Sequence, residues 1–144
     1  MIIMGIDLGD AHTGISLCDF SQTLAYPLCT INEKDENLLA KKIVKIKVDE
    51  NVESIVLGYP RNMDGSIGDR ARKVSKFKRI LKKKLGINII LWDERLTTVE
   101  AMKNFCSADI KSRDYKKNID AASSCLILQN YLDFLKNSAR QSQL

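Results

Sequence analysis

Three acidic positions in this chain have the residue types and the surroundings of a metal-binding set. Asp7 lies inside an apolar run, IIMGIDL, where a carboxylate is rarely buried unless it is paired or binds a metal ion. Glu94 follows a second apolar run, and Asp120 opens the last amphipathic stretch. Three carboxylates brought together repel one another unless a cation neutralises them. Because no cluster of histidines or cysteines accompanies them, the donor set favours Mg2+ or Mn2+.

The chemistry that such a set supports is phosphodiester cleavage. Two hard cations about 4 Å apart form the arrangement used for in-line displacement, in which one activates a water and the other stabilises the leaving oxygen. Each acid also has a structural explanation. Asp7 can cap a turn at a strand end, Asp120 can occupy a helix N-terminus, and Glu94 can pair with Arg95 or a lysine. Their joint occurrence favours the metal site.

Glycines surround the first acid. Gly5 and Gly9 lie two residues from Asp7 on either side, and Gly14 follows. A glycine inside a strand weakens the strand, and it often marks a place where a ligand or another backbone comes close. The pattern therefore predicts a site for a cation or a phosphate beside Asp7.

Length and composition indicate one globular domain in a reducing compartment. The chain has 144 residues, of which 44% are hydrophobic and 28% charged. We expect the domain to span residues 1–136 and the polar residues 137–144 to form a disordered tail. The four cysteines are scattered without a Cys-x-x-Cys pair, which favours free thiols and a cytoplasmic location. With no apolar run of about 20 residues and no signal-peptide pattern, we expect no membrane association.

The net charge of +5 becomes informative because the cations are clustered. Seven Lys and Arg residues lie between 73 and 84, inside one predicted helix, and four more lie between 111 and 117. The helix cluster is either a nucleic-acid-binding surface or a solvated helix face. The second cluster comes just before Asp120, which favours a functional role for it.

The hydrophobic periodicity predicts an α/β fold with a five-stranded mixed sheet flanked by helices. Three antiparallel strands come first and two parallel strands follow them, since the later strands are separated by helices. Pro27 removes a backbone donor and so predicts an edge strand, whereas the uniformly apolar fifth strand predicts a central or well-covered position. The predicted strands are 2–8, 15–19, 24–31, 53–58 and 87–92; the predicted helices are 35–50, 67–85, 97–106 and 119–136, with a loop at 107–117.

Four stretches of the sequence resemble the YqgF (RuvX-like) family, which has the ribonuclease H-like fold. They are GIDLGDAHTG (5–14), VLGYPRNMDGS (56–66), DERLTT (93–98) and IDAASSCLILQNYL (119–132). The resemblance implies a metal-dependent nuclease, a hydrolase of phosphodiester bonds that matures the 5′ end of the 16S rRNA precursor in ribosome biogenesis. It also implies kinship with Holliday-junction resolvases, so a nuclease for branched DNA is the alternative.

By position, the acidic set of the family falls on Asp7, Glu94 and Asp120. The family usually carries Arg at the position of His12, which near neutral pH is a weaker and pH-dependent phosphate contact. His12 is otherwise simply an exposed turn residue. The residues expected to bind or position nucleic acid are His12, Arg61, Asn62, Arg95, Arg113, Lys116 and Lys117.

Two other classes of function compete with the nuclease. The chain can be a nucleic-acid-binding module without catalysis, which differs from a nuclease by the absence of metal-dependent strand cleavage. An ATPase-like domain is disfavoured because actin-like folds close two domains around ATP, and 144 residues supply one. As partners we expect structured RNA (pre-16S rRNA) or branched DNA, together with ribosomal particles. We expect a monomer or a weak homodimer.

Overall fold

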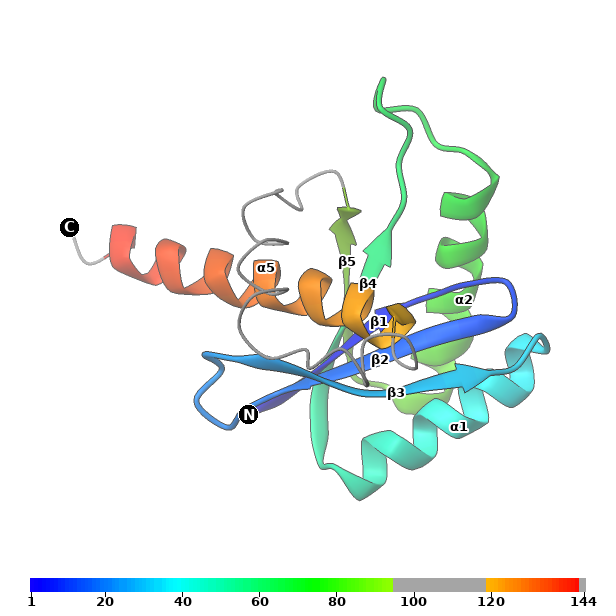
Figure 1. Cartoon of the computed structure of the whole chain (residues 1–144), viewed down its shortest axis with the longest axis horizontal. Helices are drawn as coiled ribbons and strands as arrows, with labels where there is room; N and C mark the ends of the chain where they lie inside the picture. The colour runs from blue at the N-terminus through cyan, green and yellow to red at the C-terminus, as the bar shows by residue number, and fades with distance from the viewer. Residues whose placement is uncertain (95–118, 143–144) are drawn as a thin grey trace.

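The computed structural model describes residues 1–94 and 119–142 of the chain. The predicted helix 97–106 and the predicted loop 107–117 lie outside these residues. The elements, shown in Figure 1, are β1 (Ile2–Asp7), β2 (His12–Cys18), β3 (Ala25–Asn32), α1 (Glu36–Asp49), β4 (Val52–Tyr59), α2 (Asp69–Leu85), β5 (Asn88–Asp93) and α5 (Ile119–Ser142).

The five strands form one mixed sheet in the order β3-β2-β1-β4-β5. β1, β2 and β3 pair antiparallel, β4 is parallel to β1, and β5 is parallel to β4. The predicted sheet of three antiparallel strands and two parallel ones is confirmed. Of the two positions predicted for the fifth strand, the central one is wrong, because β5 lies at an edge among the described strands. The well-covered one holds, since side chains of β5 belong to the cores on both faces of the sheet. Its apolar side chains pack against helices on both faces of the sheet. A uniformly apolar sequence is compatible with such an edge strand as well as with a central one.

The opposite edge is formed by β3, as Pro27 predicts. Proline has no N–H to donate, so it is tolerated on an edge strand or at a bulge. Here both apply, because the β2–β3 register shifts between Ile15, which pairs with Cys29, and Ser16, which pairs with Pro27. The bulge and the proline together interrupt the free edge of the sheet.

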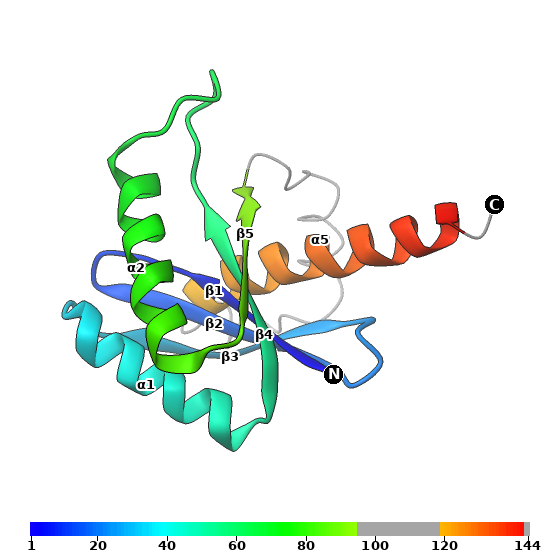
Figure 2. The same ribbon diagram turned by 180° about the vertical axis from the view of Figure 1, so that it is seen from behind.

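The two faces of the sheet carry different side chains, because successive residues of a strand point to opposite sides. On β1, Met4 and Ile6 enter the large core beneath α1 and α2. Ile3 enters a smaller core beneath α5, together with Val56 and Leu128. Figure 2 shows α1 and α2 on one side of the sheet and α5 on the other. The two faces are called below the α1–α2 face and the α5 face.

The helix ends follow local rules. Asp35 caps α1 by accepting from the backbone N–H groups of Asn37 and Leu38, and Gly86 ends α2 in the left-handed conformation (φ 64°). The predicted end of the last helix at residue 136 is wrong, since α5 continues to Ser142. Residues 137–142 are therefore helical and not a disordered tail. Their apolar repeat has ended, but alanine, arginine and glutamine favour the helix without it.

The described cysteines behave as core residues. Cys18, Cys29 and Cys125 are free thiols, and burial raises the pKa of Cys125 to about 12. A thiol that stays protonated is a poor nucleophile and a poor metal ligand. Within residues 1–94 and 119–142, none of the helices combines the length and the apolar character that a membrane span needs.

Candidate active site

Two of the three predicted acids meet at one end of the sheet. Asp7 ends β1, and Glu94 follows the last residue of β5. β4 lies between β1 and β5 and is parallel to both of them. The carboxyl ends of β1 and β5 therefore lie at the same end of the sheet. The side chains of Asp7 and Glu94 are joined by a hydrogen bond. The fold thus brings together two residues that are 87 positions apart in the sequence.

A glycine of the intervening strand makes room for this pair. A Cβ atom built on Gly58 of β4 would lie 2.7 Å from Oε1 of Glu94 and 2.6 Å from Cδ1 of Ile127 in α5. Both distances are shorter than real Cβ contacts, so a larger residue would displace the Glu94 carboxyl or the tip of the Ile127 side chain. Gly58 was not predicted as a site residue, although a glycine inside an apolar strand is the signal that could have found it.

The acid pair is half-buried, and this shifts its protonation. Burial raises the pKa of Glu94 above its usual range, and the nearby Asp93 carboxylate adds to the effect. The Arg70 guanidinium and the hydrogen bond from Asp7 act in the opposite direction. Two carboxyl groups this close repel each other when both are ionised, and a proton or a cation between them relieves that repulsion.

Arg70 is a second residue that the sequence interpretation missed. It lies in the first turn of α2, and its charge lowers the pKa of both Asp10 and Glu94. The largest effect on Asp10 comes from Lys73, whose ammonium group lies 2.9 Å from the Asp10 carboxylate. The start of α2 thus supplies positive charge beside the acid pair. No local sequence pattern predicts that the start of α2 lies near the acid pair, because the β-sheet sets the position of α2 relative to Asp7 and Glu94.

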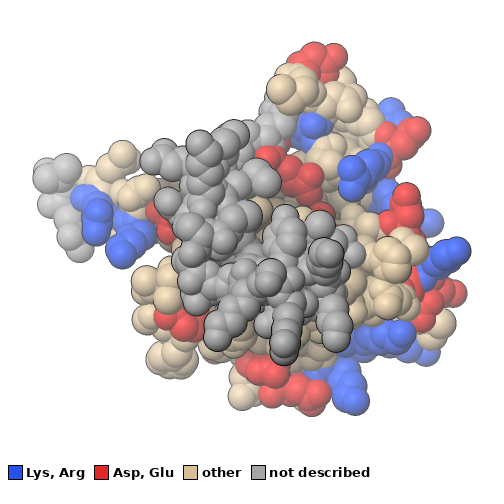
Figure 3. All heavy atoms as spheres, in the orientation of Figure 1, with Lys and Arg blue, Asp and Glu red and all other residues tan. Residues whose placement is uncertain are grey.

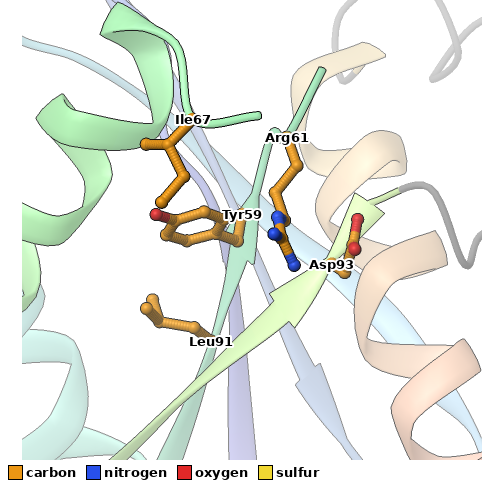
Figure 4. Close-up of a pocket in the computed structure, with 5 residues that line it drawn as sticks. All are labelled: Tyr59, Arg61, Ile67, Leu91 and Asp93. Atoms are coloured by element: carbon orange, nitrogen blue, oxygen red, sulfur yellow. The ribbon is translucent and has the colours of Figure 1, made fainter. Parts of the chain in front are cut away.

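Asp93 and Glu94 are adjacent but point to opposite faces. Asp93 lines a hollow of about 350 Å3 on the α1–α2 face, together with Tyr59, Arg61, Ile67 and Leu91. Figure 4 shows the Arg61 guanidinium directed toward Asp93 at the mouth of this hollow. The alternation along β5 therefore separates the roles of the two acids. Glu94 joins Asp7, whereas Asp93 forms part of the neighbouring wall.

The loop between β4 and α2 is held by its own polar groups. The amide of Asn62 donates to Oγ of Ser66 at 2.9 Å, and Nη2 of Arg61 donates to the Gly65 carbonyl at 2.7 Å. Gly65 has a φ of 88°, which suits glycine in this tight turn. The structure thus uses Asn62 to shape the loop. The predicted contacts of Arg61 and Asn62 with nucleic acid stay predictions.

His12 lies at the same end and on the same face of the sheet as Asp7. It begins β2 and so belongs to a strand, not to the predicted turn. It is exposed, and its Nδ1 is hydrogen-bonded to Oδ1 of Asn32 on β3. This hydrogen bond orients the ring, and the exposed side chain is accessible to a phosphate from solvent.

Two tethers set the direction of α5 and thereby place Asp120. Gln129 accepts from the Ala25 N–H at 2.9 Å at the start of β3, and Ser124 is hydrogen-bonded to Ser16 at 2.9 Å in the middle of β2. α5, followed backwards from Gln129 to Ser124, therefore approaches the end of the sheet where Asp7 lies. The backbone of Asp120, one turn further, therefore lies toward the acid pair. Its side chain lies outside the described part of the structure.

The remaining predicted residues Arg95, Arg113, Lys116 and Lys117 also lie outside the described residues. Within the described part no group of three or more His, Cys, Asp or Glu side chains is arranged to hold a metal ion. The described donor set is therefore the Asp7–Glu94 pair alone. Carboxylate oxygens are the ligands that a hard divalent cation such as Mg2+ prefers.

Two solved structures in complex with Holliday junctions align with almost the whole of this chain. RuvC of Thermus thermophilus in complex with a Holliday junction substrate aligns with a TM-score of 0.67 at 11% identity and covers 96% of both chains. The fowlpox virus resolvase with Holliday junction DNA aligns with a TM-score of 0.61 at 15% identity, over 94% of this chain and 99% of that one. These likenesses confirm the ribonuclease H-like fold.

Sequence comparison gives closer relatives. A protein of Thermoanaerobacter pseudethanolicus, named "Putative pre-16S rRNA nuclease", is 44% identical over 138 residues, which are 95% of this chain and 99% of the relative. A protein of the same name from Pelagibacter ubique is 39% identical over 93% of this chain and 89% of its own length. The family model RuvX, described as Holliday junction resolvase, matches residues 1–134. The prediction of a nuclease, a hydrolase of phosphodiester bonds, is confirmed at the level of the family. By fold, by full-length relatives and by the family model, this chain belongs to the RuvX family.

Proposed function

We propose that this protein is a nuclease that uses Mg2+ or Mn2+ to hydrolyse a phosphodiester bond near the 5′ end of the 16S rRNA precursor. The observation that carries the proposal is the Asp7–Glu94 pair, half-buried and hydrogen-bonded at the carboxyl ends of a ribonuclease H-like sheet. Ligands of open α/β sheets gather at such ends. The names of the relatives support the choice of substrate.

The residues of the chain divide the work. Asp7 and Glu94 would hold the cation through their carboxylate oxygens, and Asp120 would complete the set from the first turn of α5. When bound, a divalent cation neutralises charge on the phosphate and lowers the pKa of a water. Hydrolysis would form a phosphorus–oxygen bond to water and break the phosphorus–oxygen bond to the leaving sugar, whose oxygen would take a proton. Gly58 keeps the Glu94 carboxyl in position for this chemistry.

Phosphate groups beside the scissile bond would meet cationic side chains on both sides of the acid pair. His12 is exposed on the β2 side, and Arg61 is exposed on the β4 side. Both lie at the carboxyl end of the sheet, so a strand that crosses the acid pair can contact each of them. Arg95, Arg113, Lys116 and Lys117 belong to the same proposal. The free thiols suit a cytoplasmic enzyme that acts on ribosomal particles.

Cleavage of a 5′-extended 16S rRNA precursor tests the proposal. The wild type should cleave with Mg2+ or Mn2+ and not with a chelator. Asp7→Asn should lower the rate by about three orders of magnitude or more, because several kcal/mol of transition-state stabilisation are lost. Asp93→Asn is the matched control, since it removes a neighbouring carboxylate that points to the other face. Metal-dependent cleavage by Asp7→Asn at the wild-type rate would refute the role of the pair.

A second candidate is a nuclease for branched DNA. It rests on the likeness to RuvC and to the fowlpox resolvase, both solved with Holliday junctions, and on the description of the family. The same acid pair would serve. A four-way DNA junction and the RNA precursor, offered together at equal concentration, distinguish the two functions by which one is cut first.

A further inference from the structure

The positive charge of the chain is concentrated in two helices. α1 and α2 together contain 13 of the 23 Lys and Arg residues but three of the 18 Asp and Glu residues. The rest of the chain therefore has ten basic and 15 acidic residues. The two helices carry a formal charge of +10 and the remainder −5, although the whole chain has a charge of only +5. The modest net charge hides a strongly polarised molecule.

The more basic helix begins at the acid pair and leads away from it. The charge of Arg70 acts on Glu94, and Lys73 is ion-paired with Asp10 at 2.9 Å. α2 then continues to Leu85, so its 17 residues extend about 25 Å from the candidate active site. A nucleic acid that is bound at the acid pair can therefore follow α2.

Exposed cations form a stripe along α2. They occur at spacings of four, three and four residues, which places them on one side of the helix. The stripe spans about 16 Å, the axial distance of about five phosphates on one strand. Its members are Arg72, Lys76, Arg79 and Lys83, all exposed. Below, these four residues are called the α2 stripe.

The partners of the α2 stripe leave it available to phosphate. Arg72 pairs with Asp69 at 2.6 Å and Lys76 with Glu36 at 3.7 Å, but exposed pairs of this kind contribute little and exchange easily. Arg79 and Lys83 form no ion pair with any residue of the described part of the chain. Charge is thus present without a matching anion.

α1 extends the same surface. Lys41 of α1 and Lys84 of α2 line one hollow of about 280 Å3 together with Val44. In Figure 3 blue side chains, with red ones among them, lie along the right and lower right margins, where α2 and α1 reach the outline. Two ammonium groups on one hollow repel each other unless an anion lies between them.

Helix stability explains only part of this pattern. Lys82, Lys83 and Lys84 lie in the last turn of α2, where cations complement the helix dipole. Arg70 and Arg72 lie at the other end, where the dipole disfavours cations. A solvated helix face also needs no excess of one sign, and mixed charges are more favourable there. Arg72, Lys73 and Lys76 have acidic partners in the chain. Arg79 and Lys83 have no ion pair in the described part, which leaves these two cations available to an external anion.

We propose that the α2 stripe, with Lys41 and Lys84, binds the phosphate backbone of a nucleic-acid duplex that flanks the cleaved bond. This inference rests on the proposed function for the position of that bond, but the binding itself does not need cleavage. About 25 Å of helix matches about seven base pairs of duplex. We expect this surface to bind without base-sequence specificity, because contacts to the phosphate backbone do not distinguish the bases. Its effect is to hold structured substrates along α2 with one end at the acid pair.

Salt-dependent binding in a chelator tests the inference without any cleavage. The probe is a 20-base-pair RNA duplex with a 5′ single-stranded extension, titrated between 50 and 300 mM salt. Arg79→Gln/Lys83→Gln should make the slope of log affinity against log salt less steep by about 1.4 to 1.8, since two phosphate contacts are lost. At 0.1 M salt we expect binding about tenfold weaker or more. Adding Lys41→Gln and Lys84→Gln should enlarge both effects.

Lys136→Gln/Arg140→Gln is the matched control, because it removes two exposed charges from α5. An equal loss in this control would show a general charge effect and overturn the inference. An unchanged slope in the α2 variant with a native circular dichroism spectrum would also overturn it. So would tighter binding to phosphatidylserine vesicles than to the duplex, which would identify a membrane surface. If the wild type does not cleave the RNA precursor but the α2 variant still differs from the wild type in salt slope, only the proposed function is contradicted.

Discussion

The two faces of the sheet are built for different tasks. The α1–α2 face holds a continuous core of large side chains, including Phe77, Leu81 and Ile43, which are fully buried. The α5 face holds fewer large residues, and small or polar ones stand between them: Gly5, Ser16, Gly58 and Ser124, with Asp7 at the end. Stability is therefore concentrated on one face and chemistry on the other. A half-buried acid pair is tolerated because the opposite face compensates for it.

The largest change in stability should come from the α1–α2 face. Phe77→Ala removes a fully buried ring from the main core and should lower the free energy of unfolding by about 3–5 kcal/mol. Urea unfolding at pH 7 measures this. The molecules that remain folded should cleave at the wild-type rate, because the acid pair lies on the other face. Loss of activity beyond the loss of folded protein would contradict the separation of the two faces.

Gly58→Ala should affect chemistry more than stability. The added methyl group meets Glu94 and the tip of Ile127, so we expect a cost of about 1–3 kcal/mol and a displaced carboxyl. Gly86→Ala is the control, since its positive φ also strains an alanine but nothing lies within 4 Å. It should cost about 1 kcal/mol and leave cleavage intact. Equal activity of the two variants, measured per folded molecule, would show that Gly58 does not shape the site.

The pH dependence of stability separates the faces further. The pKa of Glu94 is raised in the folded state, so its contribution in metal-free protein is fully present below about pH 4.5 and is lost as pH rises through the raised pKa. Glu94→Gln should remove this loss and make the metal-free protein more stable than wild type at pH 7. Urea unfolding between pH 4.5 and 8 in a chelator measures the difference. Glu53→Gln, an exposed substitution on β4, should leave the wild-type profile unchanged.

The sequence alone was sufficient to predict three antiparallel strands followed by two parallel ones, and two acids at strand ends. Asp7 and Glu94 interrupt apolar runs, and this signal is local. Gly58 and Arg70 were missed because each acts on Glu94, which is far from both in the sequence. Only the tertiary structure brings these residues close to Glu94. The edge position of β5 was missed for the same reason. An edge strand that helices cover on both faces has the same apolar sequence as a central strand. The length of α5 was underestimated because the apolar repeat ends before the helix does.

The central claim is that Asp7 and Glu94 share one divalent cation. Thermal melts with and without Mg2+ test it directly on the wild type, Asp7→Asn, Glu94→Gln and the control Asp93→Asn. An ion that binds the folded state alone stabilises it, by about 2.7 kcal/mol at 100 times its dissociation constant. The wild type and Asp93→Asn should gain stability with Mg2+, and Asp7→Asn and Glu94→Gln should gain much less. Equal stabilisation of all four proteins would show that these two acids do not form one metal site.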